Sequence, residues 1–321
     1  MRKVSRLIRS FYQLLLPVVV LAFVAALTAS IWLVYTVSTP GRSAHLVTPA
    51  KFAQLSSRGA QITDETWQNE DGSMGRGWLL KGGAGAPAVV LLHRYGTDRS
   101  HVLNFGVKLS ETTNFTVLML DLRGHGLDPN VDQTTFAGCE ISDVSSAIKF
   151  LRSARTAGGE ALVGENIGIY GIELGALTGL AVAANDPSVK AIALESVPES
   201  SSDLIGSVIY ARFPFGSFVT APLARLGSYV YFATGCFERA TSCELAGKVA
   251  DRRVLLLAGP QAPYFQTSTS NLSSCFPQQT KVQAFTDLTP SGFDLTNASL
   301  KQADFYDNRV IFFFQENLAT N

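Results

Sequence analysis

One stretch of the chain places a buried strand, a sharp turn and a helix in direct succession. The apolar run from Ile167 to Tyr170 predicts the strand, and the alanine- and leucine-rich run from Ala176 to about Ala184 predicts the helix. The turn between them reads Gly171-Ile172-Glu173-Leu174-Gly175. Glycine is needed on both sides because the turn is tight and the helix passes close to the strand. The turn therefore predicts that the side chain of Glu173 stands exposed at the end of the strand, beside backbone N–H groups.

Short apolar strands alternate with helical patterns along the rest of the chain. The predicted strands lie at residues 61–69, 74–81, 88–92, 115–120, 189–194, 254–257 and 282–285, and the predicted helices at 100–110, 140–155 and 309–318. The Asp71-Gly72 pair predicts a hairpin between the first two strands. This alternation indicates an α/β fold with a mostly parallel central sheet and helices on both of its faces. Residues 197–250 carry aromatic residues and prolines but little strand signal, so we predict a cap-like insertion over the ligand-binding edge of the sheet.

The N-terminal region contains a long uncharged run, at residues 14–37, which follows four basic residues, Arg2, Lys3, Arg6 and Arg9. A run of ~20 apolar residues suffices to cross a bilayer, whereas the apolar core of a cleaved signal peptide, the alternative, is ~7–15 residues long. Basic residues remain on the cytoplasmic side, so the rest of the chain is expected to be exported. We predict a basic cytoplasmic tail at 1–13, a single membrane-spanning anchor at 14–37, a linker at 38–60 and the folded domain at 61–321.

Charge and cysteine content exclude several classes of protein. The formal net charge is zero, which argues against a nucleic-acid partner. All four cysteines, Cys139, Cys236, Cys243 and Cys275, follow the predicted anchor, where export permits disulfides. Cys236 with Cys243 is the first hypothesis, because these two are close in sequence; four free thiols are the alternative. Since no histidine accompanies these cysteines, we predict no zinc site, and we expect no cofactor.

Three motifs together resemble the α/β-hydrolase superfamily, and specifically its esterase- and peptidase-like, membrane-tethered branch. They are Leu91-Leu92-His93-Arg94-Tyr95-Gly96, then Asp121-Leu122-Arg123-Gly124-His125-Gly126, and the turn around Glu173. They are similar to the family's oxyanion loop, its D-x-R-G-x-G loop and its nucleophile elbow, a turn of the form G-x-S-x-G. The resemblance covers residues 61–318. It implies an α/β-hydrolase fold and a pocket made by Glu173 with these neighbours: His93, Arg94, Tyr95, Gly96, Ile172 and Leu174.

The residues that perform the family's chemistry differ in this chain. The family uses a serine, then an acid, then a histidine, in that order along the sequence. Glu173 occupies the serine position, and the loop at 258–263, where the acid is expected, contains no carboxylate. The loop at 287–294, where the histidine is expected, contains none, and His125 is the last histidine of the chain. The sequence therefore predicts that all three members of the triad are missing.

Three readings of the function follow. The first is a catalytically silent hydrolase fold that binds a small molecule or an envelope protein. The second is a hydrolase with altered chemistry, in which Glu173 is the nucleophile or the general base. The related haloalkane dehalogenases and epoxide hydrolases use an aspartate as nucleophile, but with a late histidine. The third is a sensor or assembly subunit of an envelope complex. Because a carboxylate in such a pocket is costly unless it is paired, we also expect an ion pair between Arg94 and Glu173.

Overall fold

The computed structural model describes residues 2–42, 44–54, 56–214 and 216–319. The chain divides into two compact units. Unit 1 contains the chain up to Val37 together with Ile205–Gly235, and unit 2 contains Ser38–Leu204 and Cys236–Asn321. Unit 2 carries the sheet and is described first.

Unit 2 is built on an eight-stranded sheet with the strand order β1-β2-β4-β3-β5-β6-β7-β8. The strands are β1 Thr63–Gln68, β2 Met74–Leu80, β3 Ala86–Leu92, β4 Thr116–Leu120, β5 Val163–Ile172, β6 Val189–Glu195, β7 Arg253–Leu257 and β8 Lys281–Phe285. Strand β2 is antiparallel to both β1 and β4, and all other neighbours are parallel. This confirms the mostly parallel sheet that the sequence predicts.

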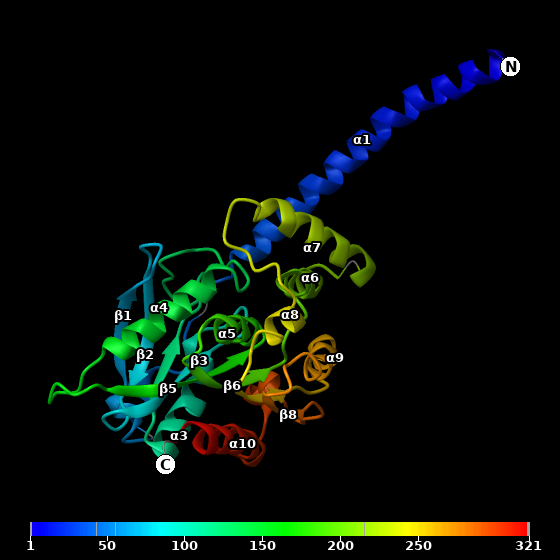
Figure 1. Cartoon of the computed structure of the whole chain (residues 1–321). Coiled ribbons are helices and arrows are strands. Elements are labelled where there is room, and N and C mark those ends of the chain that lie inside the picture. Colours follow the sequence, from blue (N-terminus) through cyan, green and yellow to red (C-terminus); the bar gives the residue numbers. More distant parts are fainter. Residues whose placement is uncertain (1, 43, 55, 215, 320–321) are drawn as a thin grey trace. The chain divides into compact units, whose positions relative to one another are not determined.

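Helices cover both faces of this sheet, as Figure 1 shows, with α3 and α10 on one face and α4, α5 and α8 on the other. The helices of unit 2 are α2 Pro49–Phe52, α3 Leu103–Thr113, α4 Cys139–Ser153, α5 Leu174–Asn185, α8 Ser242–Ala246, α9 Pro263–Leu272 and α10 Leu300–Leu318, with short 3₁₀ helices at Gly59–Gln61, Arg99–Val102 and Gly292–Asn297. Helix α10 begins nine residues before the predicted Arg309. Its first turns are polar and lack a strong apolar pattern, but a capping box between Ser299 and Gln302 starts the helix there.

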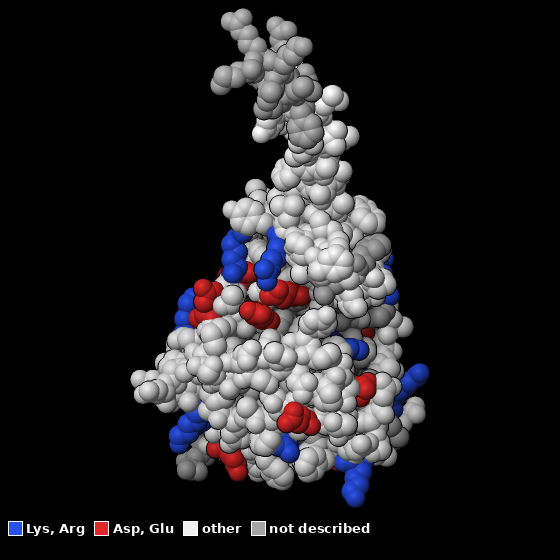
Figure 2. All heavy atoms as spheres, turned by 90° about the vertical axis from the view of Figure 1, so that its right-hand side faces the viewer, with Lys and Arg blue, Asp and Glu red and all other residues white. Residues whose placement is uncertain are grey.

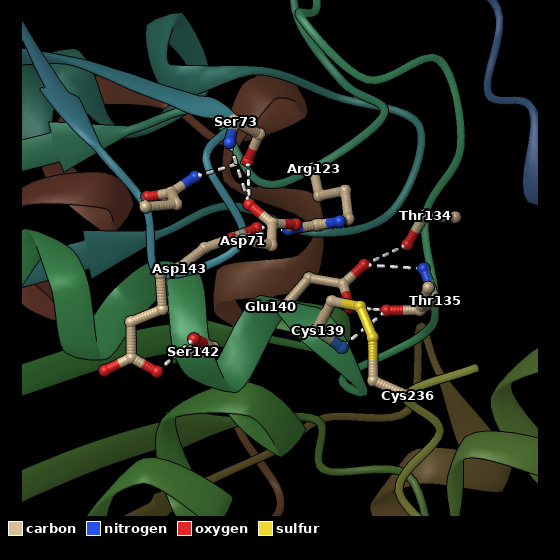
Figure 3. The surroundings of a disulfide bond; sticks show 12 residues. Asp71, Ser73, Arg123, Thr134, Thr135, Cys139, Glu140, Ser142, Asp143 and Cys236 are labelled. Atoms are coloured by element: carbon tan, nitrogen blue, oxygen red, sulfur yellow. Dashed lines mark hydrogen bonds and ion pairs between the residues drawn. A yellow bond between two sulfur atoms is a disulfide. The ribbon is translucent and has the colours of Figure 1, made fainter.

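The start of α4 is held by buried polar contacts, which Figure 3 shows. The carboxylate of Glu140 accepts hydrogen bonds from the hydroxyl of Thr134 (2.5 Å) and from the backbone N–H of Thr135 (2.8 Å). One turn further on, Asp143 binds the guanidinium of Arg123 at 2.7 and 2.9 Å. Arg123 also reaches Asp71 in the β1–β2 hairpin at 2.6 Å. The arginine of the Asp121–Gly126 loop therefore ties three separate segments of unit 2 together.

The cysteines of unit 2 form two disulfides, Cys139–Cys236 and Cys243–Cys275, with Cα atoms 5.3 and 5.2 Å apart. The expected Cys236–Cys243 pairing is therefore wrong. Cys236 lies against the start of α4, where a Cβ on Gly138 would come within 2.3 Å of the Cys236 carbonyl oxygen. Tertiary packing thus brings Cys236 to Cys139, which is 97 residues away in sequence. The first of these disulfides appears in Figure 3.

Unit 1 joins the N-terminal helix to a segment from the middle of the chain. It contains α1 Arg2–Ser38, α7 Ser217–Tyr231 and the part of α6 Ser201–Arg212 that follows Leu204. In α1, the 27 residues Tyr12–Ser38 are long and apolar enough to cross a membrane. The side chains of residues 2–11, which include the four basic residues, lie outside the described part. The place of residues 197–250 over the sheet edge stays a prediction.

The disulfide pairing can be checked by chemical mapping. Digestion without reduction, followed by mass spectrometry, is expected to recover Cys139 linked to Cys236 and Cys243 linked to Cys275. Replacing Cys243 and Cys275 together by serine is expected to lower the free energy of unfolding by up to about 4 kcal/mol, because the unfolded chain loses a cross-link. A peptide joining Cys236 to Cys243 would contradict this pairing.

Candidate functional site

The turn after β5 has the backbone geometry of a strained elbow. Glu173 lies at φ 52° and ψ −104°, a conformation that residues with a side chain rarely adopt. A Cβ on Gly171 would lie 2.2 Å from the carbonyl oxygen of Gly175, and a Cβ on Gly175 would lie 2.4 Å from that of Leu92. Both glycines are therefore required, because helix α5 starts in contact with β3 and β5.

The side chain of Glu173 is buried, with only 6% of its surface exposed. Its Oε2 accepts a hydrogen bond of 2.9 Å from the backbone N–H of Tyr95, in the loop that follows β3. The expectation of an exposed side chain is therefore wrong. The glutamate side chain is long enough to turn back toward the backbone. Its carboxyl group accepts the hydrogen bond of the Tyr95 N–H, in the loop that resembles an oxyanion loop.

Burial has the largest influence on the Glu173 carboxyl group and raises its pKa to about 7. The Tyr95 N–H, the positive charge of Arg94 and the Leu174 N–H act in the opposite direction, because each stabilises the carboxylate. The carboxyl group is consequently neutral in mildly acidic solution and changes charge near neutrality.

Arg94 does not form the expected ion pair with Glu173; no such pair joins these two described residues. The guanidinium carbon of Arg94 lies 4.6 Å from the ring centroid of Phe293 instead. The expectation is wrong because the Glu173 carboxyl group is bound by a backbone donor, the Tyr95 N–H, in place of a cation. Arg94 contributes through its charge alone.

The two histidines near this loop brace the backbone. Nδ1–H of His93 donates to its neighbour, the carbonyl of Arg94, at 2.8 Å, and Nε2 accepts the Leu122 N–H at 3.0 Å. His125 lies against it, with ring centroids 5.2 Å apart, and its Nδ1–H donates to the carbonyl of Arg123 at 2.9 Å. Burial lowers the pKa of His93 to about 4 and that of His125 to about 3. Both rings are therefore neutral at physiological pH.

The loops after β7 and β8 are those in which the sequence resemblance leads us to expect an acid and a histidine. They meet through a hydrogen bond of 3.0 Å from the N–H of Leu288 to the carbonyl of Ala258. In the second loop, Asp287 is exposed and lies 3.3 Å from the side-chain amide of Gln266. Within the described ranges, no group of three or more His, Cys, Asp or Glu residues is arranged to hold a metal ion.

A second buried acid lies at the end of the neighbouring strand, and sequence reasoning missed it. Glu195 ends β6, accepts a hydrogen bond from the hydroxyl of Tyr306 at 2.9 Å and another from Ser196 at 2.9 Å. The Tyr306 hydroxyl lies 3.1 Å from that of Tyr170. Burial raises the pKa of Glu195 to about 7. The signal that the sequence offered was a single acidic residue, Glu195, directly after the predicted strand at 189–194.

The elbow and this second acid share a backbone contact. The N–H of Glu173 donates to the carbonyl of Glu195 at 2.9 Å. Two carboxyl groups whose pKa values are both raised to about 7 therefore stand at adjacent strand ends. Acids with raised pKa values are found both at functional sites and in buried structural networks.

A cleft of about 340 Å³ opens beside the Asp121–Gly126 loop. Its lining mixes apolar residues with charges of both signs: Pro49, Ala50, Ile62, Trp78 and Leu127 on the apolar side, and His45, Asp64, Arg76, Arg99, Asp121 and Asp128 on the polar side. Arg99 is buried together with Trp78: its guanidinium lies 4.6 Å from the Trp78 ring centroid and 3.2 Å from Asp64. Its backbone N–H also donates to Asp121 at 2.9 Å. Glu173 does not line this cleft.

Solved structures with a similar fold include esterases and an α/β-hydrolase. The Pyrococcus furiosus esterase Pf2001 matches with a TM-score of 0.63 and 17% identity, over 88% of this chain and 99% of that one. The α/β-hydrolase GrgF from Penicillium matches at 0.57 and 14%, over 81% and 99%. An esterase from Pyrobaculum calidifontis matches at 0.53 and 13%, over 91% of each chain. No protein-family model and no curated protein matches the sequence. The chain therefore has the α/β-hydrolase fold; identities this low say nothing about activity.

The buried acid makes stability depend on pH. The pKa of Glu173 rises from 4.5 to about 7 on folding, so its stabilising contribution is complete below pH 4.5 and is lost as the pH rises through 7. Glu173→Gln is neutral at every pH. Between pH 5 and pH 8, the free energy of unfolding is therefore expected to fall less in this variant than in the parent, by up to about 3 kcal/mol. Thermal and denaturant unfolding in detergent at both pH values measure this.

The matched control is Glu70→Gln, since Glu70 is exposed and its pKa is lowered by Lys149 and Ser142. This variant should keep the pH dependence of the parent between pH 5 and pH 8. If Glu173→Gln also keeps it, the Glu173 carboxyl group is not held neutral in the fold.

Proposed function

We propose that this protein is a membrane-anchored pseudoenzyme, a hydrolase fold that binds a ligand and does not carry out serine hydrolysis. The observation that supports this most directly is the Tyr95 N–H···Glu173 hydrogen bond. An oxyanion hole acts only when its donors point at a substrate oxygen. In this chain, one donor of the corresponding loop is taken by the protein's own carboxyl group.

The surroundings of Glu173 support the same proposal. A serine mechanism needs a histidine within hydrogen-bond reach and an acid to orient it. His93 uses both ring nitrogens on the backbone, and Nδ1 of His125 is likewise engaged. The loops after β7 and β8 supply no histidine, and the exposed Asp287 faces Gln266.

The cleft beside Asp121 is the binding site in this proposal. Its volume, about 340 Å³, falls within the usual range for small-molecule sites, ~300–1,000 Å³. Its walls present the guanidinium of Arg76 and the carboxylate of Asp64 beside apolar residues such as Ile62, so they suit a small ligand that carries both charges.

Anchoring and export complete the proposal. Helix α1 is the membrane anchor, its basic N-terminal residues stay in the cytoplasm, and the sheet-bearing unit is exported. The two disulfides support this orientation, because such bonds persist in oxidising compartments. The protein binds its ligand, or an envelope protein partner, on that side of the membrane.

A second candidate function rests on the elbow itself. Glu173 keeps a strained backbone conformation and a pKa raised to about 7. Strain of this kind is concentrated at functional sites, and a general base works best with a pKa near the operating pH. These two observations favour a hydrolase in which Glu173 acts as nucleophile or general base on an ester-like or epoxide-like substrate.

Hydrolysis assays separate the two candidates. The full chain in detergent is assayed on esters, epoxides and amides beside Glu173→Gln and Glu173→Ser. We expect the parent and Glu173→Gln to show the buffer rate. Glu173→Ser frees the Tyr95 N–H and is expected to gain at most the ~10³–10⁴-fold residual rate of triad-less hydrolases. A fluorophosphonate probe should label none of the three proteins.

Glu195→Gln serves as the matched control, because it neutralises the other buried acid whose pKa is raised to about 7. Turnover by the parent and by Glu195→Gln that disappears in Glu173→Gln would overturn the binding proposal and establish the second candidate.

The cleft is tested by ligand screening. A panel of small zwitterionic and polar compounds is expected to contain members that raise the melting temperature of the parent and of Glu173→Gln. Arg76→Gln should weaken that binding at least about tenfold, because it removes one charge partner of the ligand. Lys149→Gln, which removes an exposed cation paired with Glu70, should bind like the parent. Equal binding by Arg76→Gln would place the ligand elsewhere.

A further inference from the structure

Helix α7 in unit 1 has an inverted distribution of side chains. Its buried face carries small residues, with Thr220, Ala224 and Ser228 all at most 2% exposed. Its exposed face carries large ones, with Phe218 at 82% and Tyr229 at 67%. In water, large apolar side chains are driven inward, so an amphipathic helix of a soluble protein shows the opposite arrangement.

Small residues also occupy the closest helix contacts within unit 1, beside buried apolar residues such as Val34 and Ile209. A Cβ on Gly227 of α7 would lie 2.4 Å from the carbonyl oxygen of Ser30 in α1, so these two helices touch through their backbones. A Cβ on Gly206 of α6 would lie 3.6 Å from the Cβ of Ala224. Close backbone approach through small residues is characteristic of helices that associate within lipid, where burying large apolar side chains between helices gains nothing.

The charge pattern of this segment points to the same environment. Residues 205–235 contain two charged residues, Arg212 and Arg225, both exposed, and no Asp or Glu. The apolar part of α1, 12–38, contains no charged residue, and its described length is white in Figure 2. A surface that combines exposed aromatics with arginines alone matches a membrane interface that holds anionic headgroups.

Two aromatic contacts indicate the depth of the segment. On α1, Trp32 and Tyr35 are 55% and 52% exposed, near the end of the apolar run. Trp32 lies 5.9 Å from Phe213, and Tyr35 lies 6.4 Å from Tyr231, between ring centroids. Tryptophan and tyrosine are concentrated at the level of the lipid headgroups. The start of the α6–α7 connection, at Phe213, and the end of α7, at Tyr231, therefore contact α1 at the level of the lipid headgroups.

We propose that Ile205–Gly235 is a second membrane-contacting element, which lies in the bilayer interface against the last turns of α1. Phe218 and Tyr229 enter the acyl region, and Arg212 and Arg225 face lipid phosphates. This inference rests on the proposed membrane anchor, because the same bilayer must hold α1. It adds a broad interfacial contact to a single-helix tether.

Fluorescence quenching in vesicles tests the proposal with the full chain. Cysteine is introduced as Phe218→Cys or Tyr229→Cys, and each variant is labelled with bimane; the native cysteines are held in disulfides and do not react. The vesicles contain phosphatidylcholine with phosphatidylglycerol. Nitroxides on the acyl chains are expected to quench both labels, at a depth of ~5–10 Å below the headgroup boundary. Aqueous iodide should quench them several-fold less.

Two control positions make each outcome decisive. Phe305→Cys labels a phenylalanine on α10 of unit 2 that is as exposed as Tyr229, and it should respond to iodide and not to the lipid nitroxides. Val24→Cys labels the middle of α1 and reports the anchor itself. Quenching by lipid at Val24 but not at Phe218 or Tyr229 overturns this inference and leaves the anchor in place. Loss of lipid quenching at Val24 as well overturns both.

Discussion

The hydrogen bond from Tyr95 N–H to the Glu173 carboxyl group is the interaction on which the site depends. It joins the loop after β3 to the turn after β5, and it holds a titratable group against the backbone of that loop. The turn holds a non-glycine residue at positive φ, which costs about 1–3 kcal/mol. The two flanking glycines make the turn possible, and the hydrogen bond keeps the carboxyl group inside it.

A consequence of burial is that two acids with raised pKa values lie at the carboxyl ends of the neighbouring strands β5 and β6. Glu173 and Glu195 both have a pKa raised to about 7, and each is served by neutral donors, a backbone N–H in one case and hydroxyl groups in the other. A buried carboxyl group without a cationic partner avoids most of the desolvation cost by taking up a proton. This explains why Arg94 is free to stack on Phe293.

Helix α7 of unit 1 packs differently from the core of unit 2. Unit 2 buries large apolar side chains such as Phe105, Tyr170 and Phe314 between its sheet and helices. Helix α7 of unit 1 buries the small residues Thr220, Ala224 and Ser228 and exposes Phe218 and Tyr229. The core of unit 2 therefore follows the burial expected in water, whereas α7 has the arrangement on which the proposed bilayer contact rests.

The sequence by itself determined the class of fold and the position of the sharp turn around Glu173. Apolar runs such as Ala88–Leu92, the glycines around Glu173 and the uncharged run at 14–37 reflect local geometry and burial, which a sequence pattern records directly. Only the tertiary structure decided how the side chains are used. It folded Glu173 onto the Tyr95 N–H, turned Arg94 to Phe293, gathered Glu195 with Tyr306, and joined Cys139 to Cys236 across 97 residues. These choices depend on contacts between distant segments, and spacing along the chain carries no information about such contacts.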